Sequence, residues 1–298
     1  MAIVGATATG KSSVALGVAR RLGGRVELVS VDSMQVYVGL DIGTAKPTLT
    51  EQREIPHHCI DLVEPTVDFT VADFRIASAH ALATIAGRER CALLVGGTGL
   101  YHRVVIDDLD LPGEFPAVRE SLEGESDTSA LFDRLRSLDP AAAAKIEPGN
   151  RRRIVRALEV TVGAGRPFSS FGPGLDSYPA TDVAQIGIRR PREVTAERVE
   201  RRVHAMIDAG LLDEVRELHA RGLSRTARQA LGYKELIEHL EGRMSHDEAV
   251  ERIIVRTRQF AVRQERWFRR DPRVRWIDVG DGPVDPVIDT VIDAFETA

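Results

Sequence analysis

The sequence has 298 residues, of which 43% are hydrophobic and 29% are charged, and its formal net charge is −5. This composition is typical of a soluble globular protein, long enough for one large domain or two smaller ones. The molecule as a whole is not a polycation, so a polyanionic partner must be met by a local basic patch. No apolar run reaches the length of a membrane span, and no basic segment precedes the first apolar residues, so neither membrane insertion nor export is predicted.

The cysteines and histidines do not indicate a disulfide framework or a metal site. Cys59 and Cys91 are far apart in apolar surroundings, which favours a reducing cytoplasm. His57, His58 and Cys59 are consecutive, and this adjacency suits alternate faces of an extended segment better than a tetrahedral metal site. We therefore expect a cytoplasmic protein with no metal at this triplet.

A phosphate-binding loop lies close to the N-terminus. Gly5, Gly10, Lys11 and Ser12 have the G-x-x-x-x-G-K-S spacing, between a short apolar run and an amphipathic helix. The glycines let the backbone turn its N–H groups inward, and the helix N-terminus adds positive potential. Lys11 is expected to reach the outer phosphate, and Ser12 to ligate Mg²⁺. The motif leaves open whether the cargo is a nucleoside triphosphate or another diphosphate. The preceding strand is short, which predicts two or three further residues upstream.

The second predicted strand, residues 26–31, ends at Asp32. The carboxyl ends of parallel strands form the ligand crevice of an open α/β sheet, on the edge that also carries the phosphate loop. Asp32 could ligate Mg²⁺ through water or take a proton from an acceptor substrate; a helix-cap or turn role is the alternative. Lys46, in the polar loop of residues 41–47, could contact phosphate or remain solvated.

A third predicted strand, residues 91–95, follows a helix over residues 69–86. It ends at Gly96 and Gly97, where an NTP-hydrolysing protein usually has an acid directed at Mg²⁺. This absence argues against a motor or switch ATPase. The glycines predict a close backbone approach of a substrate, to which Thr98 would offer its hydroxyl.

Residues 112–179 differ from the rest in composition, with helical pieces separated by proline and glycine. Four helices are predicted here, over residues 116–122, 129–138, 140–146 and 150–162. They would form an insertion that projects from the sheet.

The last of these helices has an unusual distribution of charge. Asn150 is a good N-cap, but the first turns then carry Arg151, Arg152, Arg153 and Arg156. The helix dipole disfavours each such positive charge by about 0.3–1 kcal/mol. A pattern that is costly to its own helix indicates an anionic partner, nucleic acid or phosphate; a solvated basic face is the alternative.

The remaining part of the chain is predicted to return to the sheet with a strand over residues 183–188 and a helix over residues 194–218. This helix brings Arg198, Arg201 and Arg202 close together. Arginines that come late in a P-loop chain often close over the phosphates, although spacing alone does not select one of them.

A final predicted helix, residues 251–270, carries seven arginines against two glutamates, with aromatic residues between them. Such a helix can hold a polyanion on one face and pack its aromatic side chains on the other. The predicted fold is α/β: a P-loop NTPase-like parallel sheet flanked by helices, with an α-helical insertion domain. The core would comprise residues 1–112 and 181–298, and the insertion residues 113–180.

Six segments, taken in order, carry a resemblance to a known family. They are Gly5–Ser12, Ser30–Tyr37, Asp41–Pro47, Gly96–Tyr101, Arg152–Glu159 and Gln229–Lys234. This ordered set closely resembles the tRNA dimethylallyltransferases and covers essentially the whole chain. The phosphate loop is shared with many other enzymes, but the ordered set is specific to this family.

The resemblance implies a reaction, its substrates and its cofactor. A dimethylallyl group would pass from dimethylallyl diphosphate to N6 of the adenosine immediately 3′ of the anticodon, in tRNAs that read codons beginning with U. The implied partners are tRNA, through its anticodon stem-loop, and dimethylallyl diphosphate, with Mg²⁺ as cofactor. A cytoplasmic monomer without a membrane partner is expected.

The resemblance also implies roles for individual residues. Asp32 would be the base that takes the N6 proton, and Thr98 would border the reaction channel. Lys11 and Arg202 would bind the departing diphosphate, and Ser12 would ligate Mg²⁺. The implied diphosphate loop is Gly5, Ala6, Thr7, Ala8, Thr9, Gly10, Lys11 and Ser12. The implied tRNA contacts are Asp32, Ser33, Met34, Gln35, Thr98, Arg119, Arg152, Arg153, Ile154, Val155, Arg156, Gln229, Ala230, Leu231, Gly232, Tyr233 and Lys234.

Three other functions share some of these features. A small-molecule P-loop kinase with a lid would use Asp32 to deprotonate an acceptor hydroxyl. An isopentenyltransferase that acts on free adenine nucleotides would share the chemistry, and a non-catalytic RNA-binding P-loop module would share the fold. The arginine-rich helix after Asn150 and the missing acid after Val95 argue against the kinase.

Overall fold

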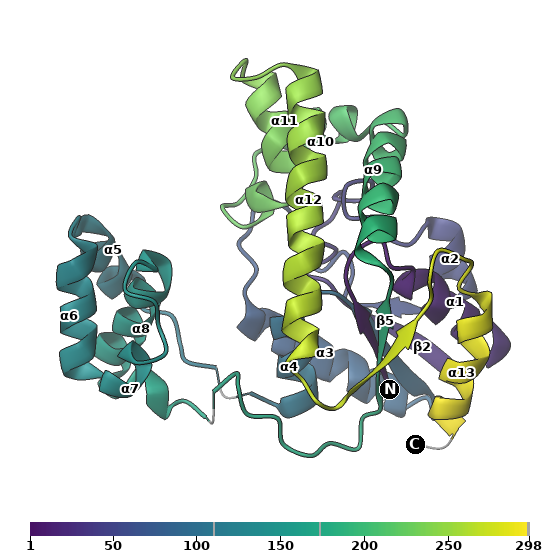
Figure 1. Cartoon of the computed structure of the whole chain (residues 1–298), viewed down its shortest axis with the longest axis horizontal. Helices are drawn as coiled ribbons and strands as arrows, with labels where there is room; N and C mark the ends of the chain where they lie inside the picture. Colours follow the sequence, from purple (N-terminus) through teal and green to yellow (C-terminus); the bar gives the residue numbers. More distant parts are fainter. Residues whose placement is uncertain (110, 173, 297–298) are drawn as a thin grey trace. The chain divides into compact units, whose positions relative to one another are not determined.

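The computed structural model describes residues 1–109, 111–172 and 174–296, which form two compact units (Figure 1). The larger unit joins Met1–Asp107 to Ala180–Ala298, and the smaller unit is Asp108–Pro179. Each unit has a hydrophobic core of its own.

The larger unit is built on a six-stranded sheet, in which every pair of neighbours is parallel and the strand order is β3-β2-β4-β1-β5-β6. The strands β1 and β2 are buried along their whole length, as a parallel sheet covered on both faces requires. The strands are β1 Ala2–Gly5, β2 Val26–Val31, β3 His57–His58, β4 Cys91–Gly96, β5 Gln185–Arg189 and β6 Val274–Asp278.

The predictions for β1, β2 and β4 are confirmed, and β5 lies close to its predicted bounds. The strands β3 and β6 were not predicted. Strand β3 has only two residues, and β6 exposes Arg275 and Asp278, so neither shows a continuous apolar run. Pairing with a neighbouring strand, rather than local sequence, defines both.

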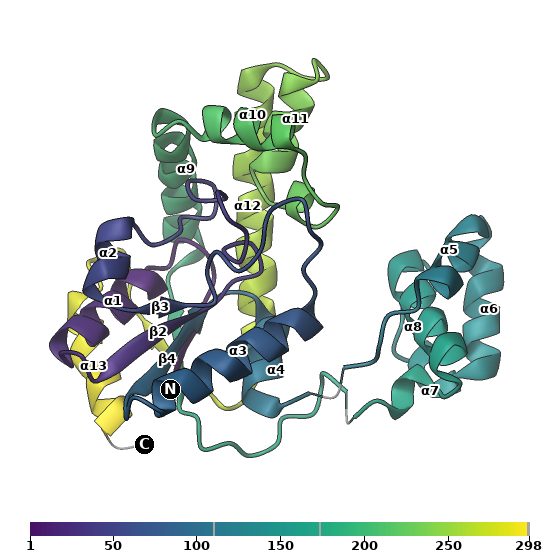
Figure 2. The ribbon, with the colours of Figure 1, turned by 180° about the vertical axis from the view of Figure 1, so that it is seen from behind.

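Helices cover both faces of the sheet (Figure 2). On one face, α1 and α13 pack on side chains such as Leu28, whereas Val29, the next residue of β2, points to the core formed with α3, α4 and α9 to α12. The helices of this unit are α1 Lys11–Arg21, α2 Leu49–Glu54, α3 Val71–Ala86, α4 Gly99–Asp107, α9 Arg192–Asp208, α10 Leu211–Arg221, α11 Tyr233–Leu240, α12 His246–Arg269 and α13 Asp285–Glu296, with a 3-10 turn, η2, at Ala227–Gln229.

The single helix predicted over residues 194–218 is wrong, because the chain breaks there into α9 and α10. Gly210, with a φ of 97°, adopts the left-handed conformation that begins α10. The turn redirects the chain so that Leu211 and Val215 are buried. Helical periodicity on both sides of a glycine therefore belonged to two helices.

The smaller unit is helical and confirms the four predicted helices. The side chain of Asn150 caps the last helix by accepting a hydrogen bond from the Arg153 backbone N–H at 3.3 Å. A core around Leu135, Ile154 and Leu158 holds the helices together. The elements are α5 Pro116–Gly124, α6 Thr128–Leu138, α7 Pro140–Ala143, α8 Arg151–Ala164 and a 3-10 turn, η1, at Phe168–Ser170.

Candidate active site

The phosphate loop connects β1 to α1 and is shaped by its two glycines. Gly5 has a φ of 153°, and a Cβ atom there would lie 2.6 Å from the carbonyl oxygen of Ile188. Gly10 has a φ of 99° and caps the N-terminus of α1. The hydroxyl of Thr9 donates to the carbonyl of Ala6 at 2.9 Å, which closes the turn. The loop therefore presents the N-terminus of α1, a general anion-binding arrangement.

Two arginines of α9 contact this loop. Nε of Arg198 donates to the carbonyl of Ala8 at 2.8 Å, and Nη1 of Arg202 donates to the hydroxyl of Thr7 at 3.5 Å. These acceptors orient the guanidinium groups without cancelling their charge. They face a cavity of about 380 Å³ lined by Ala8, Gly10, Lys11, Ser12, Ser13, Arg198, Arg201 and Arg202.

Lys11 lies within the same positive region. Burial, and then the charge of Arg202, lower the pKa of Lys11 from 10.5 to about 8, although Asp32 acts in the opposite direction. Burial also lowers the pKa of Arg202, and again Asp32 opposes the shift. Each shift reports a cation that is poorly solvated and incompletely neutralised, so an anion bound here would stabilise both.

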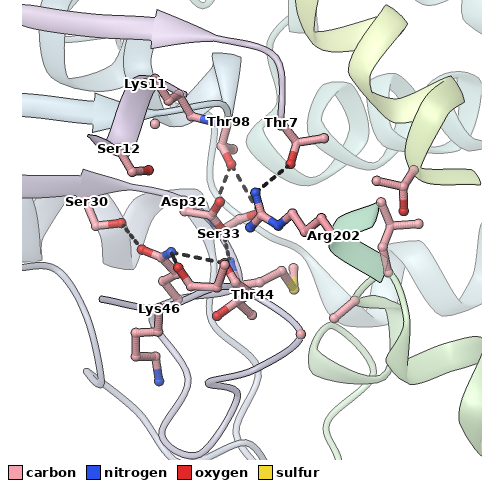
Figure 3. A pocket seen from close by; sticks show the side chains of 18 of the residues that line it. Thr7, Lys11, Ser12, Ser30, Asp32, Ser33, Thr44, Lys46, Thr98 and Arg202 are labelled. Carbon is pink, nitrogen blue, oxygen red and sulfur yellow. Dashed lines mark hydrogen bonds between the residues drawn. The ribbon is translucent and has the colours of Figure 1, made fainter. Parts of the chain in front are cut away.

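A larger cavity of about 480 Å³ adjoins the phosphate loop and brings together many of the predicted site residues (Figure 3). Its walls come from the phosphate loop, the ends of β2 and β4, α9, α12, and the loops of residues 43–47 and 229–232. The predicted residues that line it are Thr7, Lys11, Ser12, Asp32, Ser33, Met34, Gln35, Thr98, Arg202, Gln229, Ala230, Leu231 and Gly232.

Asp32 follows β2 directly. The backbone N–H of Met34 donates to its Oδ1 at 2.9 Å, which fixes the carboxylate at the start of the turn after the strand. Beside it, the hydroxyl of Thr98 accepts from the Ser33 backbone N–H at 3.1 Å. Figure 3 shows Asp32, Thr98 and Arg202 gathered around one space. The carboxylate is therefore only partly satisfied by its own turn, and its second oxygen can accept a proton within reach of the cations.

Gln35 also lines the cavity, but its amide already has partners. Its Oε1 accepts from the Ser30 hydroxyl at 2.7 Å, and its Nε2 donates to the carbonyls of Thr44 and Ala45 at 3.2 and 3.3 Å. Gln35 thus ties the loop of residues 41–47 to the end of β2.

Of the two roles proposed from the sequence for Lys46, the solvated one is wrong, whereas a contact with phosphate or substrate stays a prediction because Lys46 lines the larger cavity. Its side chain is only 3% exposed, and its amine donates to the carbonyl of Tyr37 at 2.9 Å and to the carboxylates of Asp41 and Asp61. In Figure 3 the amine points away from the labelled phosphate-loop residues. Lys46 is an internal ion-pair partner that fixes its loop.

The glycines at and after the end of β4 approach the protein's own chain closely. A Cβ at Gly96 would lie 2.0 Å from the carbonyl oxygen of Val31, and one at Gly97 would lie 2.2 Å from Nε2 of Gln264. A Cβ at Gly99 would lie 2.1 Å from the ring of Trp267. Strand β2 and helix α12 therefore pack closely on these glycines, and the segment reaches the cavity through both Gly96 and Thr98.

Gln264 of α12 is a site residue that sequence reasoning missed. Its side chain is buried, its Oε1 accepts from the Thr7 backbone N–H at 2.8 Å, and its Nε2 donates to the carbonyl of Gly97 at 2.9 Å. One amide therefore joins the phosphate loop to the segment that carries Thr98. No local signal marks a glutamine within an arginine-rich helix.

In the smaller unit, the predicted RNA-contacting residues divide into two groups. Arg152 and Arg153 are exposed on α8, and the described residues include no side-chain partner for either. The side chains of Ile154 and Val155 pack inside the core, so this part of the run offers only the two arginines to a partner.

Arg156 and Arg119 are occupied within the smaller unit. Arg156 donates to the Glu159 carboxylate and to the Pro112 carbonyl, both at 2.9 Å, and Arg119 lies 3.7 Å from the same carboxylate. Glu159 is only 1% exposed, so these arginines neutralise a buried charge. Arg119 also pairs with Glu123 at 2.8 Å.

The predicted segment 229–234 lies at the cavity through its first four residues, Gln229 to Gly232. The Tyr233 side chain is fully buried, and burial is the main cause of its raised pKa. Lys234 donates to Oε1 of Gln229 at 3.5 Å. The Tyr233 ring is therefore part of the core beneath the loop of residues 229–232, and it is not presented to a ligand.

The triplet His57, His58 and Cys59 holds structural contacts. Nδ1 of His57 bonds the Ile55 carbonyl at 2.7 Å, Nε2 of His58 bonds the buried Glu27 carboxylate at 2.6 Å, and Cys59 is a buried free thiol. Among the residues placed by the structure, no three His, Cys, Asp or Glu side chains are grouped to hold a metal ion.

The part of the chain that the structure describes includes no helix long and apolar enough to cross a membrane.

Comparisons with known proteins cover the whole chain. The IPP transferase family model matches residues 35–271, and the isopentenyl transferase family model matches residues 1–64. A tRNA dimethylallyltransferase of Nocardioides sp. is 46% identical over 98% of this chain and 95% of its own length. One from Geobacter metallireducens is 44% identical, over 97% and 95%.

Solved structures agree with these relatives. The full-length tRNA isopentenylpyrophosphate transferase of Bacillus halodurans superposes with a TM-score of 0.73 at 38% identity, over 99% of this chain and 95% of that one. A eukaryotic dimethylallyltransferase acting on tRNA shares the fold, with a TM-score of 0.81 at 24% identity over 99% of this chain and 79% of that one. By family model, sequence identity and fold, this chain belongs to the IPP transferase family.

Proposed function

We propose that this chain transfers a dimethylallyl group from dimethylallyl diphosphate to tRNA, at N6 of the adenosine 3′ of the anticodon, in tRNAs that read codons beginning with U. The products are N6-dimethylallyladenosine and diphosphate. The observation that carries the proposal is one cavity in which Lys11 and Arg202 stand beside Asp32 and Thr98. Family membership supports the identity of the transferred group and of the acceptor.

The phosphate loop and its cations would hold the diphosphate. In the reaction the allylic C–O bond breaks, the diphosphate keeps the electron pair, and negative charge grows on the leaving oxygen. Lys11 and Arg202 are incompletely neutralised cations, so they stabilise this charge more than they stabilise the ground state. The remaining loop residues would contribute backbone N–H groups.

The residues of the site fit Mg²⁺ together with a diphosphate. Ser12 lines both cavities, and Asp32 lies in the larger one, so hard oxygen donors face the place where phosphate oxygens would lie. Mg²⁺ is commonly held by one or two protein oxygens plus substrate phosphates. When bound, the ion would neutralise diphosphate charge, with Ser12 as its protein ligand.

Asp32 would act on the acceptor. The lone pair of adenine N6 is delocalised into the ring, so the nitrogen attacks well only as its proton is removed. N6 forms a bond to C1 of the dimethylallyl group, and its proton passes to the free oxygen of Asp32. The Thr98 hydroxyl, held by Ser33, borders the path by which the base enters. The base must leave its stack to reach this point.

The tRNA would contact both units of the chain. The insertion, predicted as residues 113–180, would offer Arg152 and Arg153 to phosphates, whereas Arg119 and Arg156 pair with Glu159. The core, predicted as residues 1–112 and 181–298, would contribute the cavity segments after β2 and before α11. We infer a cytoplasmic monomer, and affinity for tRNA that falls as salt rises.

The test is a transfer assay with labelled dimethylallyl diphosphate and Mg²⁺. Unmodified tRNA should become labelled, whereas AMP and ATP should not, and replacing the adenosine 3′ of the anticodon by guanosine should abolish labelling. Labelling of free nucleotides alone would instead indicate an isopentenyltransferase of adenine nucleotides. Phosphate transfer from ATP, without prenyl transfer, would reject the proposal in favour of a kinase.

A further inference from the structure

A carboxylate outside the predicted motifs binds the loop of residues 41–47. Glu214, on α10, accepts hydrogen bonds from three successive backbone N–H groups, at 3.1 Å from Asp41, 2.8 Å from Ile42 and 3.3 Å from Gly43. Successive amides that converge in this way form an anion-binding nest, and here the anion is a side chain of the protein itself.

The same carboxylate also holds the segment that precedes α11. Oη of Tyr233 donates to Oε1 of Glu214 at 2.5 Å. The Tyr233 ring packs so closely on Gly43 that a Cβ there would lie 2.4 Å from it. Glu214 therefore links two segments that are distant in sequence, residues 41–43 and the start of α11.

Each linked segment continues into a wall of the larger cavity. Residues 43–47 and 229–232 line it, and the carbonyls of Thr44 and Ala45 hold the amide of Gln35. The phosphate-binding cations have different partners: Lys11 donates to Ala6 and Arg202 to Thr7. The contacts of Glu214 therefore support the cavity walls formed by residues 43–47 and 229–232, and they do not involve the phosphate loop.

We propose that Glu214 is a positioning residue for the tRNA acceptor, which holds residues 41–47 and 229–232 at the separation that admits the target adenosine. The inference rests on the proposed function, since it assigns these walls to the base. It extends the site to a side chain that does not itself reach the cavity.

The Glu214→Gln variant tests the carboxylate with little change of shape. Its single carbonyl oxygen can still accept from the loop, but the new NH₂ group faces N–H donors that it cannot satisfy. Because hydrogen bonds to a charged group are stronger than neutral ones, we expect the KM for tRNA to rise about ten-fold or more. The dissociation constant for dimethylallyl diphosphate should stay within about two-fold. Glu217→Gln, at an exposed position of the same helix, is the matched control and should leave both constants unchanged.

Hydrogen exchange gives a readout that does not depend on activity. The amides of Asp41, Ile42 and Gly43 should exchange at least about ten-fold faster in Glu214→Gln than in wild type. Tyr233→Phe keeps all three amide contacts and removes only the phenolic one, so it remains informative if Glu214→Gln fails to fold. It should raise the KM for tRNA by a smaller factor, with those amides still protected.

The outcomes separate this inference from the proposed function. Wild-type protein that does not label tRNA at all would reject the proposed function. Wild-type labelling together with an unchanged tRNA KM in Glu214→Gln would overturn the positioning role alone. An equal loss of affinity for both substrates would also overturn it, because it would show a general structural effect.

Discussion

The two units of the molecule both carry an arginine-rich helix, and the partners of Arg198 and Arg202 on α9 differ from the partner of Arg156 on α8. On α9, Arg198 and Arg202 bond a carbonyl and a hydroxyl of the phosphate loop, which orient the guanidinium groups but leave them charged. On α8, Arg156 bonds the buried Glu159 carboxylate and is neutralised. The number of arginines therefore does not identify a ligand site. The charge of their partners does, because only an incompletely neutralised cation gains strongly from an added anion.

The largest effect is expected at the carboxylate that faces the cations of the core. Asp32→Ala should lower the single-turnover rate of transfer by about 10²–10⁴-fold, because N6 loses its base. Asp32→Asn is the matched control: it keeps an acceptor for the Met34 N–H but cannot take a proton, so it should be as slow. Both variants should still bind dimethylallyl diphosphate in calorimetry. A wild-type rate in either one would remove Asp32 from the base role.

The next effect tests the contrast between the two helices directly. Arg202→Ala should slow transfer by about 10²–10³-fold, because its charge acts on the leaving diphosphate. Arg156→Ala should leave the chemical step unchanged and lower the melting temperature instead, since Glu159 would lose a partner while buried. Arg216→Ala, at an exposed ion pair with Asp213, controls for loss of a surface charge. Equal losses of rate in the Arg202 and Arg156 variants would contradict the comparison.

The depressed pKa of Lys11 predicts how diphosphate binding depends on pH. The charged form binds the anion, and it is lost on going above a pKa of about 8 rather than above the ordinary 10.5. Affinity for dimethylallyl diphosphate should be nearly constant below pH 8 and then fall by up to about ten-fold per unit as the pH rises. The dissociation constant measured from pH 6.5 to 9.5 shows this break.

Lys11→Arg is the control for the pH profile, since an arginine stays charged throughout this range. This variant should bind dimethylallyl diphosphate more weakly than wild type does, because the guanidinium group fits the narrow loop poorly. The break in affinity near pH 8 should vanish. A break that persists in Lys11→Arg would assign the titration to another group.

The smallest effect is expected from the exposed arginines of α8. Arg152→Ala and Arg153→Ala should each weaken tRNA binding by a few-fold. Each should also make the slope of log K, the association constant for tRNA, against the logarithm of the salt concentration shallower by about one, the value of one phosphate contact. Affinity for dimethylallyl diphosphate should not change. Filter binding over a series of salt concentrations measures both quantities, and an unchanged salt slope in both variants would exclude the phosphate contacts.

Much of the fold could be predicted from local sequence. The spacing of Gly5, Gly10 and Lys11 specifies a loop before a helix, and Asn150 is the N-cap of α8, as expected. Alternation within β2 sends Leu28 and Val29 to opposite faces of the sheet, as a buried strand requires. Local signals failed where a glycine between two helical patterns was a break, at Gly210.

The placement of Asp32, Thr98 and Arg202 around one cavity was also expected, for a topological reason. The carboxyl ends of neighbouring parallel strands meet at one edge, so the residues after β2 and β4 must lie beside the phosphate loop. The sequence did not distinguish Arg202 from Arg198 and Arg201, because all three lie within about one helical turn. The resemblance to a family singled out Arg202, and the structure places it at both cavities.

By itself, the sequence determined the phosphate loop, most strands of the sheet and the helical insertion, since each has a local signature of spacing, apolar runs or helix caps. Only the tertiary structure decided which polar groups hold the site together. Gln264 bonds Thr7 across 257 positions, and Glu214 bonds Ile42 across 172. A side chain that satisfies a distant backbone group leaves no periodic or compositional trace, because its partner is set by how the chain folds back on itself.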